Sequence, residues 1–104
     1  MRLVEKKMLS ALYGERNYKS GNTEVRDGKV YLHGNHIATK VGYDVFPNLE
    51  TLTNWPTATT KSRLRALGFN VRQRDGYVYI NNELLSVACR KGSDLFYKVE
   101  GIYP

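Results

Sequence analysis

The sequence predicts an α+β protein made of two similar units, each a short helix followed by a three-stranded antiparallel meander. Two stretches carry apolar residues every three or four positions, as on one face of a helix. Each is followed by segments in which apolar and polar residues alternate, as in strands. The turns between these segments contain Asp27-Gly28 and Asp75-Gly76, and Asp-Gly is a strong hairpin signal because both residues tolerate a positive φ.

The length of 104 residues fits one domain. We expect residues 1–104 to form it from a helix-meander unit at 1–41, a connection with a short helix at 42–56, and a second helix-meander unit at 57–104.

The first unit begins with a predicted helix at 2–13, in which Leu3, Met8 and Leu12 share one face. Gly14 is expected to end it in the left-handed conformation. The polar stretch after it is expected to be a connection. The elements that follow are strands at 23–26, 29–33 and 36–41, with turns at 27–28 and 34–35.

Residues 42–48 are expected to form a connection, and Asn48 can cap a short helix at 49–54. After a break at Trp55-Pro56, Thr57 or Thr59 can cap a second helix, which ends at Leu67 before Gly68. The remaining predicted elements are strands at 69–74, 77–80, 83–89 and 94–99, turns at 75–76 and 81–82, and a loop at 90–93.

The two units resemble each other in sequence. DGKVYL at 27–32 matches DGYVYI at 75–80, and LSAL at 9–12 matches LRAL at 64–67. An internal duplication would explain both matches and would give the fold approximate two-fold symmetry. Chance is the alternative, because turns and helical motifs of this kind are common.

The charge favours an anionic partner. The formal net charge is +6 and the isoelectric point is near 9.6, which suits nucleic acid, an anionic surface or an acidic protein. Between Thr51 and Arg74 there is no acidic residue. The basic residues in this run are Lys61, Arg63, Arg65, Arg72 and Arg74.

The spacing of these basic residues suggests a phosphate-binding surface. Lys61 and Arg65 are four apart, on one face of the predicted helix, with Arg63 to one side. Arg72 and Arg74 share one face of the predicted hairpin. The hydroxyl groups of Thr59 and Thr60 at the helix start can add phosphate contacts. The alternative is a solvated charged face.

Catalysis has little support. The sequence has no glycine-rich phosphate loop, no His-Glu-x-x-His helix and no nucleophile elbow. His33, His36 and Cys89 are the only residues that suggest a metal site, and nothing in the sequence brings them together. We expect no cofactor, no metal and no enzyme activity. A nuclease that uses His33 and His36 is the less favoured alternative.

A soluble intracellular protein is expected. No apolar run approaches the roughly 18 residues of a membrane span. Glu5, Lys6 and Lys7 interrupt the apolar N-terminus, which is wrong for a signal peptide. Cys89 is the only cysteine, which fits a reducing compartment. Exposed edge strands leave a homodimer open.

The stretch LETLTNWPTATTKSRLRALGFNVRQRDGYVYI, residues 49–80, resembles the second half of a winged helix-turn-helix domain. The resemblance implies a recognition helix whose side chains face the major groove or its flanking phosphates, and a hairpin wing. Lys61 departs from it, because that family usually buries an aliphatic residue there. The residues implied on the helix are Thr59, Thr60, Lys61, Arg63 and Arg65, and those on the wing are Arg72, Arg74 and Tyr77.

The phrases YLHGNHIA and NWPTATTKSRLRALG, in this order and spacing, also resemble a class of small proteins encoded by tailed bacteriophages. That resemblance implies a role in the cytoplasm of the infected bacterium. The function we expect is therefore a non-enzymatic phage DNA-binding or regulatory protein that contacts duplex DNA. The alternative is a host-takeover inhibitor that binds an acidic host protein.

Overall fold

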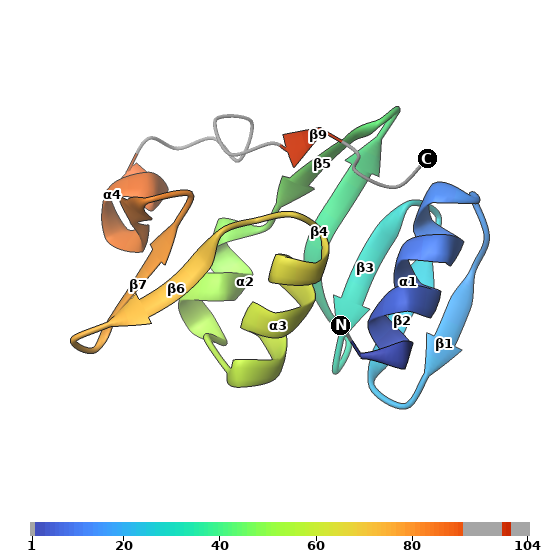
Figure 1. The fold of residues 1–104 in the computed structure, drawn as a ribbon, viewed down its shortest axis with the longest axis horizontal. Helices are drawn as coiled ribbons and strands as arrows, with labels where there is room; N and C mark the ends of the chain where they lie inside the picture. Colours follow the sequence, from blue (N-terminus) through green and yellow to red (C-terminus); the bar gives the residue numbers. More distant parts are fainter. Residues whose placement is uncertain (1, 91–98, 101–104) are drawn as a thin grey trace.

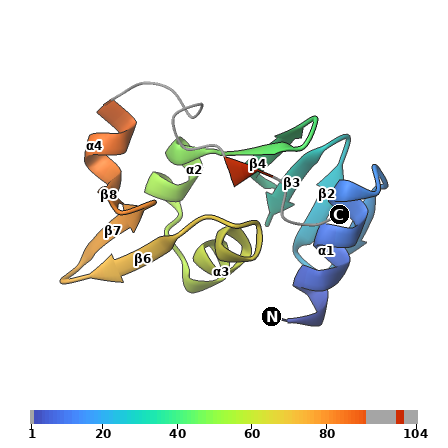
Figure 2. The ribbon, with the colours of Figure 1, turned by 45° about the horizontal axis from the view of Figure 1, so that its top comes forward.

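The computed structural model describes residues 2–90 and 99–100, and within them the chain is α+β, with four helices and two antiparallel sheets (Figure 1). This confirms the predicted fold class. The sheets lie at opposite ends of the molecule, with two helices between them, as the two views in Figures 1 and 2 show. The helices are α1 (Leu3–Tyr13), α2 (Leu49–Asn54), α3 (Ala58–Ala66) and α4 (Leu85–Arg90).

The first sheet has the order β1-β2-β3-β4-β5-β9, and the second has the order β6-β7-β8. The strands of the first are β1 (Tyr18–Ser20), β2 (Thr23–Arg26), β3 (Lys29–Leu32), β4 (Asn35–Val41), β5 (Asp44–Pro47) and β9 (Val99–Glu100). The strands of the second are β6 (Val71–Arg74), β7 (Tyr77–Ile80) and β8 (Glu83–Leu84).

One hydrophobic cluster joins the two sheets. It includes Met8 and Leu12 from α1, Val30 from β3, Leu64 from α3 and Ile80 from β7, all essentially inaccessible to solvent. The burial of these apolar side chains is the main favourable contribution to folding. Within residues 2–90 and 99–100, no helix is both long and apolar enough to cross a membrane.

Two segments predicted as connections are strands. β1 pairs with β2, and β5 pairs with β4, both in antiparallel register. The first unit is therefore larger than the predicted three-stranded meander. β1 (YKS) is mostly exposed and polar, so it carries little period-two signal. β5 (DVFP) alternates between half-buried and buried residues, but the adjacent apolar residues Val45 and Phe46 hide that alternation in the sequence. β1 is held mainly by backbone pairing with β2, whereas Val45 of β5 is also fully buried in the core.

The predicted strand at 83–89 is wrong beyond its first two residues. Only Glu83 and Leu84 are extended, and Leu85–Arg90 forms α4. Leu85 and Ala88, three residues apart, are buried on one side of this helix. Of the last predicted strand, 94–99, only Val99 lies within the described residues, where β9 pairs with β5.

The predicted Asp-Gly turns are confirmed by positive φ values at Asp27 (52°), Gly28 (79°), Asp75 (52°) and Gly76 (82°). The turn after β3 is displaced by one residue from the prediction. It is made by His33 and Gly34, with φ values of 52° and 78°. The turn at Asn81-Asn82 is confirmed, with φ values of 49° and 69°.

The end of α1 differs from the prediction. Gly14 has φ −86°, and Glu15, with φ 57°, takes the left-handed conformation. A side chain at residue 14 would place its Cβ 2.8 Å from the Ser10 carbonyl oxygen, so the glycine allows a close backbone approach. Gly68, with φ 108°, follows the end of α3 as predicted.

The two meanders share one geometry. Thr23 pairs with Leu32 and Val71 with Ile80, so each hairpin has the same register around its Asp-Gly turn. The next turn is also closed in the same way. The His33 N–H donates to the Asn22 carbonyl at 2.8 Å, and the Asn81 N–H donates to the Asn70 carbonyl at 2.8 Å. The repeat seen in the sequence is thus a repeat in structure.

Thr57 rather than Thr59 caps α3. The Thr57 hydroxyl accepts the Thr60 N–H at 3.1 Å, which satisfies one of the backbone donors that have no partner within the first turn of a helix.

We expect Thr57→Ala to lower the free energy of unfolding by about 1 kcal/mol. Thr59→Ala is the matched control and should change it by less than about 0.5 kcal/mol. Urea titration followed by circular dichroism measures both, and an equal loss in the two variants would contradict the cap.

Candidate nucleic-acid interface

Helix α3 lies between the two sheets and is covered on more than one face. Leu64 and Leu67 are fully buried. Lys61 and Arg63 are also buried, with only 9% and 6% of their surface exposed. Burial on this scale means that neither side chain can reach a partner without a change in the fold.

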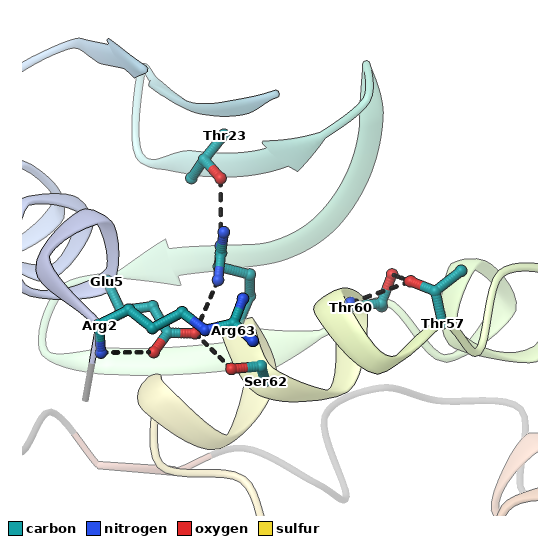
Figure 3. Close-up of polar contacts among 7 residues, drawn as sticks. All are labelled: Arg2, Glu5, Thr23, Thr57, Thr60, Ser62 and Arg63. Carbon is teal, nitrogen blue, oxygen red and sulfur yellow. Dashed lines mark hydrogen bonds and ion pairs between the residues drawn. The ribbon is translucent and has the colours of Figure 1, made fainter. Parts of the chain in front are cut away.

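Arg63 connects three elements. Its Nη1 donates to Glu5 Oε2 of α1 at 2.8 Å, and its Nε donates to Thr23 Oγ1 of β2 at 3.1 Å. Figure 3 shows the guanidinium reaching from α3 towards both residues. A buried charge is tolerated only where a counter-charge and hydrogen bonds satisfy it, and this site supplies both.

The carboxylate of Glu5 is held from several sides. Ser62 donates from its hydroxyl to Oε2 at 2.6 Å, and the backbone N–H of Arg2 donates to Oε1 at 3.2 Å (Figure 3). Burial by itself would raise the pKa of Glu5. The hydrogen bonds from Ser62, Arg2 and Arg63, with the charge of Arg63, outweigh that effect and lower the pKa below its usual 4.5.

The other buried polar residues of α3 are also engaged inside the protein. Lys61 Nζ donates to Gln73 Oε1 of β6. Thr60 is 3% exposed, and its hydroxyl lies 2.9 Å from that of Thr57. Three predicted contact residues, Thr60, Lys61 and Arg63, are therefore structural. This corrects the prediction that they face a groove of DNA, and the winged-helix resemblance is not confirmed.

Two predicted residues of α3 keep some access to solvent. Thr59 is half-buried. Arg65 is exposed, and its Nε donates to the Val71 carbonyl at the start of β6 at 2.7 Å. This bond places the Arg65 guanidinium beside the second sheet. β6 is an edge strand of that sheet, and the Arg65 side chain covers part of its free edge.

The β6–β7 hairpin brings the remaining predicted residues together. Val71 is buried, so the alternation along β6 turns Arg72 and Arg74 to the opposite, outer face. Tyr77 lies directly across from Arg74 and Tyr79 across from Arg72, and directly paired residues lie on the same face. Tyr77 is 60% exposed, and the Arg74 side chain is 84% exposed.

A groove of about 500 Å³ runs along this outer face. Arg72 forms one wall and donates from Nη2 to Asn82 Oδ1 at 2.5 Å. We call the set Arg72, Arg74, Tyr77, Tyr79 and Asn82 the hairpin face. Asp75, in the turn, is 3.9 Å from Arg74 Nε, and both side chains are highly exposed, so the pair is weak. Within residues 2–90, Arg72 takes part in no ion pair.

Sequence reasoning missed Tyr79 and Asn82. Tyr79 follows Tyr77 by two residues in a predicted strand, so the strand period by itself would have placed it on the same face. Asn82 lies in the turn after β7 and reaches Arg72 only because the turn folds back, which no local pattern indicates.

The equivalent face of the first meander is different. Arg26 corresponds to Arg74, and its guanidinium carbon lies 4.6 Å from the centre of the Tyr31 ring. Arg26 also pairs with Glu24 at 3.6 Å. The cation there already has an aromatic and an acidic neighbour, whereas the hairpin face carries two arginines and two tyrosines, with the exposed Asp75 beside Arg74.

The residues considered for catalysis do not converge. His36 Nε2 lies 2.6 Å from Thr39 Oγ1, and His33 is exposed in a turn. Cys89 is half-buried on α4, with Sγ 3.2 Å from Thr53 Oγ1. In the part of the chain that the structure describes, no three histidine, cysteine or acidic side chains group together as metal ligands would.

The profile of the Kyanoviridae Gp96 protein family matches residues 1–98. The chain belongs to this family. It is therefore a phage protein, as the resemblance to tailed-bacteriophage proteins implied. Neither the curated proteins nor the solved structures give a match. The family match covers the four helices and both hairpins with Asp-Gly turns.

We expect Arg63→Ala to lower the free energy of unfolding by about 3–5 kcal/mol, because it leaves the Glu5 carboxylate buried without its cation. Arg65→Ala is the matched control. It removes an exposed arginine from the same helix and should cost less than about 1 kcal/mol. Urea unfolding of the two variants measures the difference, and similar losses would show that the buried pair contributes little.

Stability should also depend on pH through Glu5. Because its pKa in the folded protein is below 4.5, the ionised carboxylate stabilises the fold above that pH, and the contribution is lost as the pH falls through the lowered pKa. Glu5→Gln should be less stable at neutral pH and should lose stability less steeply below pH 4.5. Thermal unfolding across this range tests it, with Glu24→Gln, a half-buried carboxylate in a surface ion pair, as the control.

Proposed function

We propose that this phage protein is a non-enzymatic nucleic-acid-binding protein that acts in the cytoplasm of the infected bacterium. Its contact surface is the hairpin face, with Arg65 beside it. The single observation that carries the proposal is that Arg72 and Arg74 share an exposed face with Tyr77 and Tyr79. Guanidinium groups bind phosphates, and aromatic rings contact sugars and bases.

The hairpin, rather than α3, is the element proposed to enter the nucleic acid. Lys61 and Arg63 stabilise the fold from inside, so α3 has few charges to offer. A two-stranded ribbon fits the major groove of duplex DNA, and an exposed sheet face can also carry a single strand. The net charge of +6 favours the approach of either.

A second candidate is an inhibitor that binds a host protein. It is supported by a separate groove of about 410 Å³ beside Trp55, which is 54% exposed. Tryptophan is enriched among the residues that contribute most to binding. In nuclease-treated host lysate, this candidate requires the protein to retain one stoichiometric partner and Trp55→Ala to release it. Retention of that partner by the variant would argue against the groove.

Removing the two arginines should weaken binding and its salt dependence together. For Arg72→Ala plus Arg74→Ala, we expect the slope of log affinity against log salt to fall by about 1.4 on single strands and about 1.8 on duplex DNA, because about two phosphate contacts are lost. Fluorescence anisotropy over a salt series measures the slope.

The matched control is Arg26→Ala plus Lys29→Ala, which removes the same charge from the same face of the first hairpin, where Arg26 corresponds to Arg74 and Lys29 to Tyr77. It should leave the slope nearly unchanged. If both double variants lose the same affinity and slope, binding depends on net charge and not on the hairpin face. If the unchanged protein binds no nucleic acid at low salt, the proposed function is wrong.

A further inference from the structure

We propose that the hairpin face binds an unpaired nucleic-acid strand, with successive bases stacked on Tyr77 and Tyr79 and the backbone phosphates held by Arg74 and Arg72. The inference rests on the proposed function and names its ligand. The net charge attracts single-stranded and duplex nucleic acid alike, and the inference is that the hairpin face prefers the single strand.

The first argument is the spacing of the two rings. Tyr77 and Tyr79 are two residues apart on β7 and lie on the same face, so their Cα atoms are separated by about 6.8 Å. Bases in a duplex are about 3.4 Å apart along the axis. Two neighbouring bases can each cover one of these rings only if the strand is stretched and the bases are no longer stacked on each other.

The second argument is the pairing of each ring with a cation. Arg74 lies across from Tyr77 and Arg72 across from Tyr79, and directly opposite side chains have Cβ atoms about 4.5–5.5 Å apart. The face thus presents one ring and one guanidinium at every second residue along the paired strands. An extended strand repeats one base and one phosphate per nucleotide, so the two patterns match in order and in charge.

The third argument concerns access to the base faces. A tyrosine ring stacks on the face of a base in a duplex only after that base is unstacked from its neighbour, which is energetically unfavourable. A single strand presents the faces of its bases without this step. Tyr77 is 60% exposed and can accept a base with little rearrangement.

The groove beside the second ring-and-guanidinium pair, Tyr79 and Arg72, gives space for a nucleotide and holds a cation in place. It is lined by Arg72, Tyr79 and Asn82 and has a volume of about 500 Å³. The bond from Arg72 to Asn82 Oδ1 at 2.5 Å holds the guanidinium beside the groove before a ligand arrives, which reduces the entropy lost on binding. Asp75 lines the turn end of the groove, so the phosphates are expected nearer Asn82.

Three labelled ligands of one length test the inference by fluorescence anisotropy at one salt concentration. They are an oligothymidine single strand, a duplex, and an abasic single strand that keeps the phosphates but lacks the bases. We expect the oligothymidine to bind most tightly. The abasic strand should bind more weakly, because it retains only the contacts to Arg72 and Arg74.

The variants separate stacking from charge. Tyr77→Ala and Tyr79→Ala should each weaken oligothymidine binding by about five- to 150-fold and should leave the affinity for the abasic strand nearly unchanged. Tyr77→Phe and Tyr79→Phe keep the ring and should retain most of the affinity. Tyr43→Ala, which removes another exposed tyrosine far along the chain, is the control and should bind like the original protein.

A second readout is independent of affinity. A strand that carries 2-aminopurine should lose fluorescence when its base stacks on a tyrosine, and the loss should disappear with Tyr77→Ala plus Tyr79→Ala. Circular dichroism of each variant shows that it is folded.

The outcomes distinguish the inference from the proposed function. Equal or tighter binding to the duplex, with alanine variants of both tyrosines unaffected, overturns the single-strand inference. If Arg72→Ala plus Arg74→Ala still weakens binding in that case, the proposed function stands. Binding of none of the three ligands overturns both.

Discussion

The ion pair between Glu5 and Arg63 is the contact on which the arrangement of the molecule depends. It joins α1 to α3 at 2.8 Å, and the same guanidinium reaches Thr23 in β2. A charged side chain this deeply buried needs its partner, because an unpaired buried charge destabilises a fold by several kcal/mol. The pair therefore fixes α3 against the first unit and turns the polar side of that helix inward.

The inward orientation of α3 decides which basic residues remain available. Arg63 bonds Glu5 and so joins the two units, whereas Lys61 bonds Gln73 and holds α3 against β6 within the second unit. Arg72 and Arg74 lie on the outer side of β6, and both remain exposed to solvent. The basic residues of the acid-free run thus fall into two groups: Lys61 and Arg63 hold the fold together from inside, and Arg72 and Arg74 form part of an exposed surface.

The repeated meanders show how one backbone can carry two different surfaces. Both hairpins have the same register and the same Asp-Gly turn. In the first, Arg26 lies over Tyr31 and pairs with Glu24. The second carries arginine at the position of Glu24, so its cations are not balanced across the strand. Two differences, arginine for Glu24 and tyrosine for Lys29, therefore give the second face two arginines and two tyrosines with no carboxylate among the four paired positions.

The sequence by itself determined the elements whose signals are local: α1, the helix cap at Asn48, the hairpins at Asp27-Gly28 and Asp75-Gly76, and the shared face of Arg72 and Arg74. Each follows from contacts within a few residues. The sequence left the cap of α3 open between Thr57 and Thr59, and the structure decided for Thr57. Tertiary structure decided β1, β5, α4 and the burial of Lys61 and Arg63. β1 and β5 pair with the strands next to them in the chain, but their own residues alternate too weakly to mark them as strands. An arginine is buried only where a distant carboxylate, here Glu5, meets it. Periodicity along the chain carries no information about such partners.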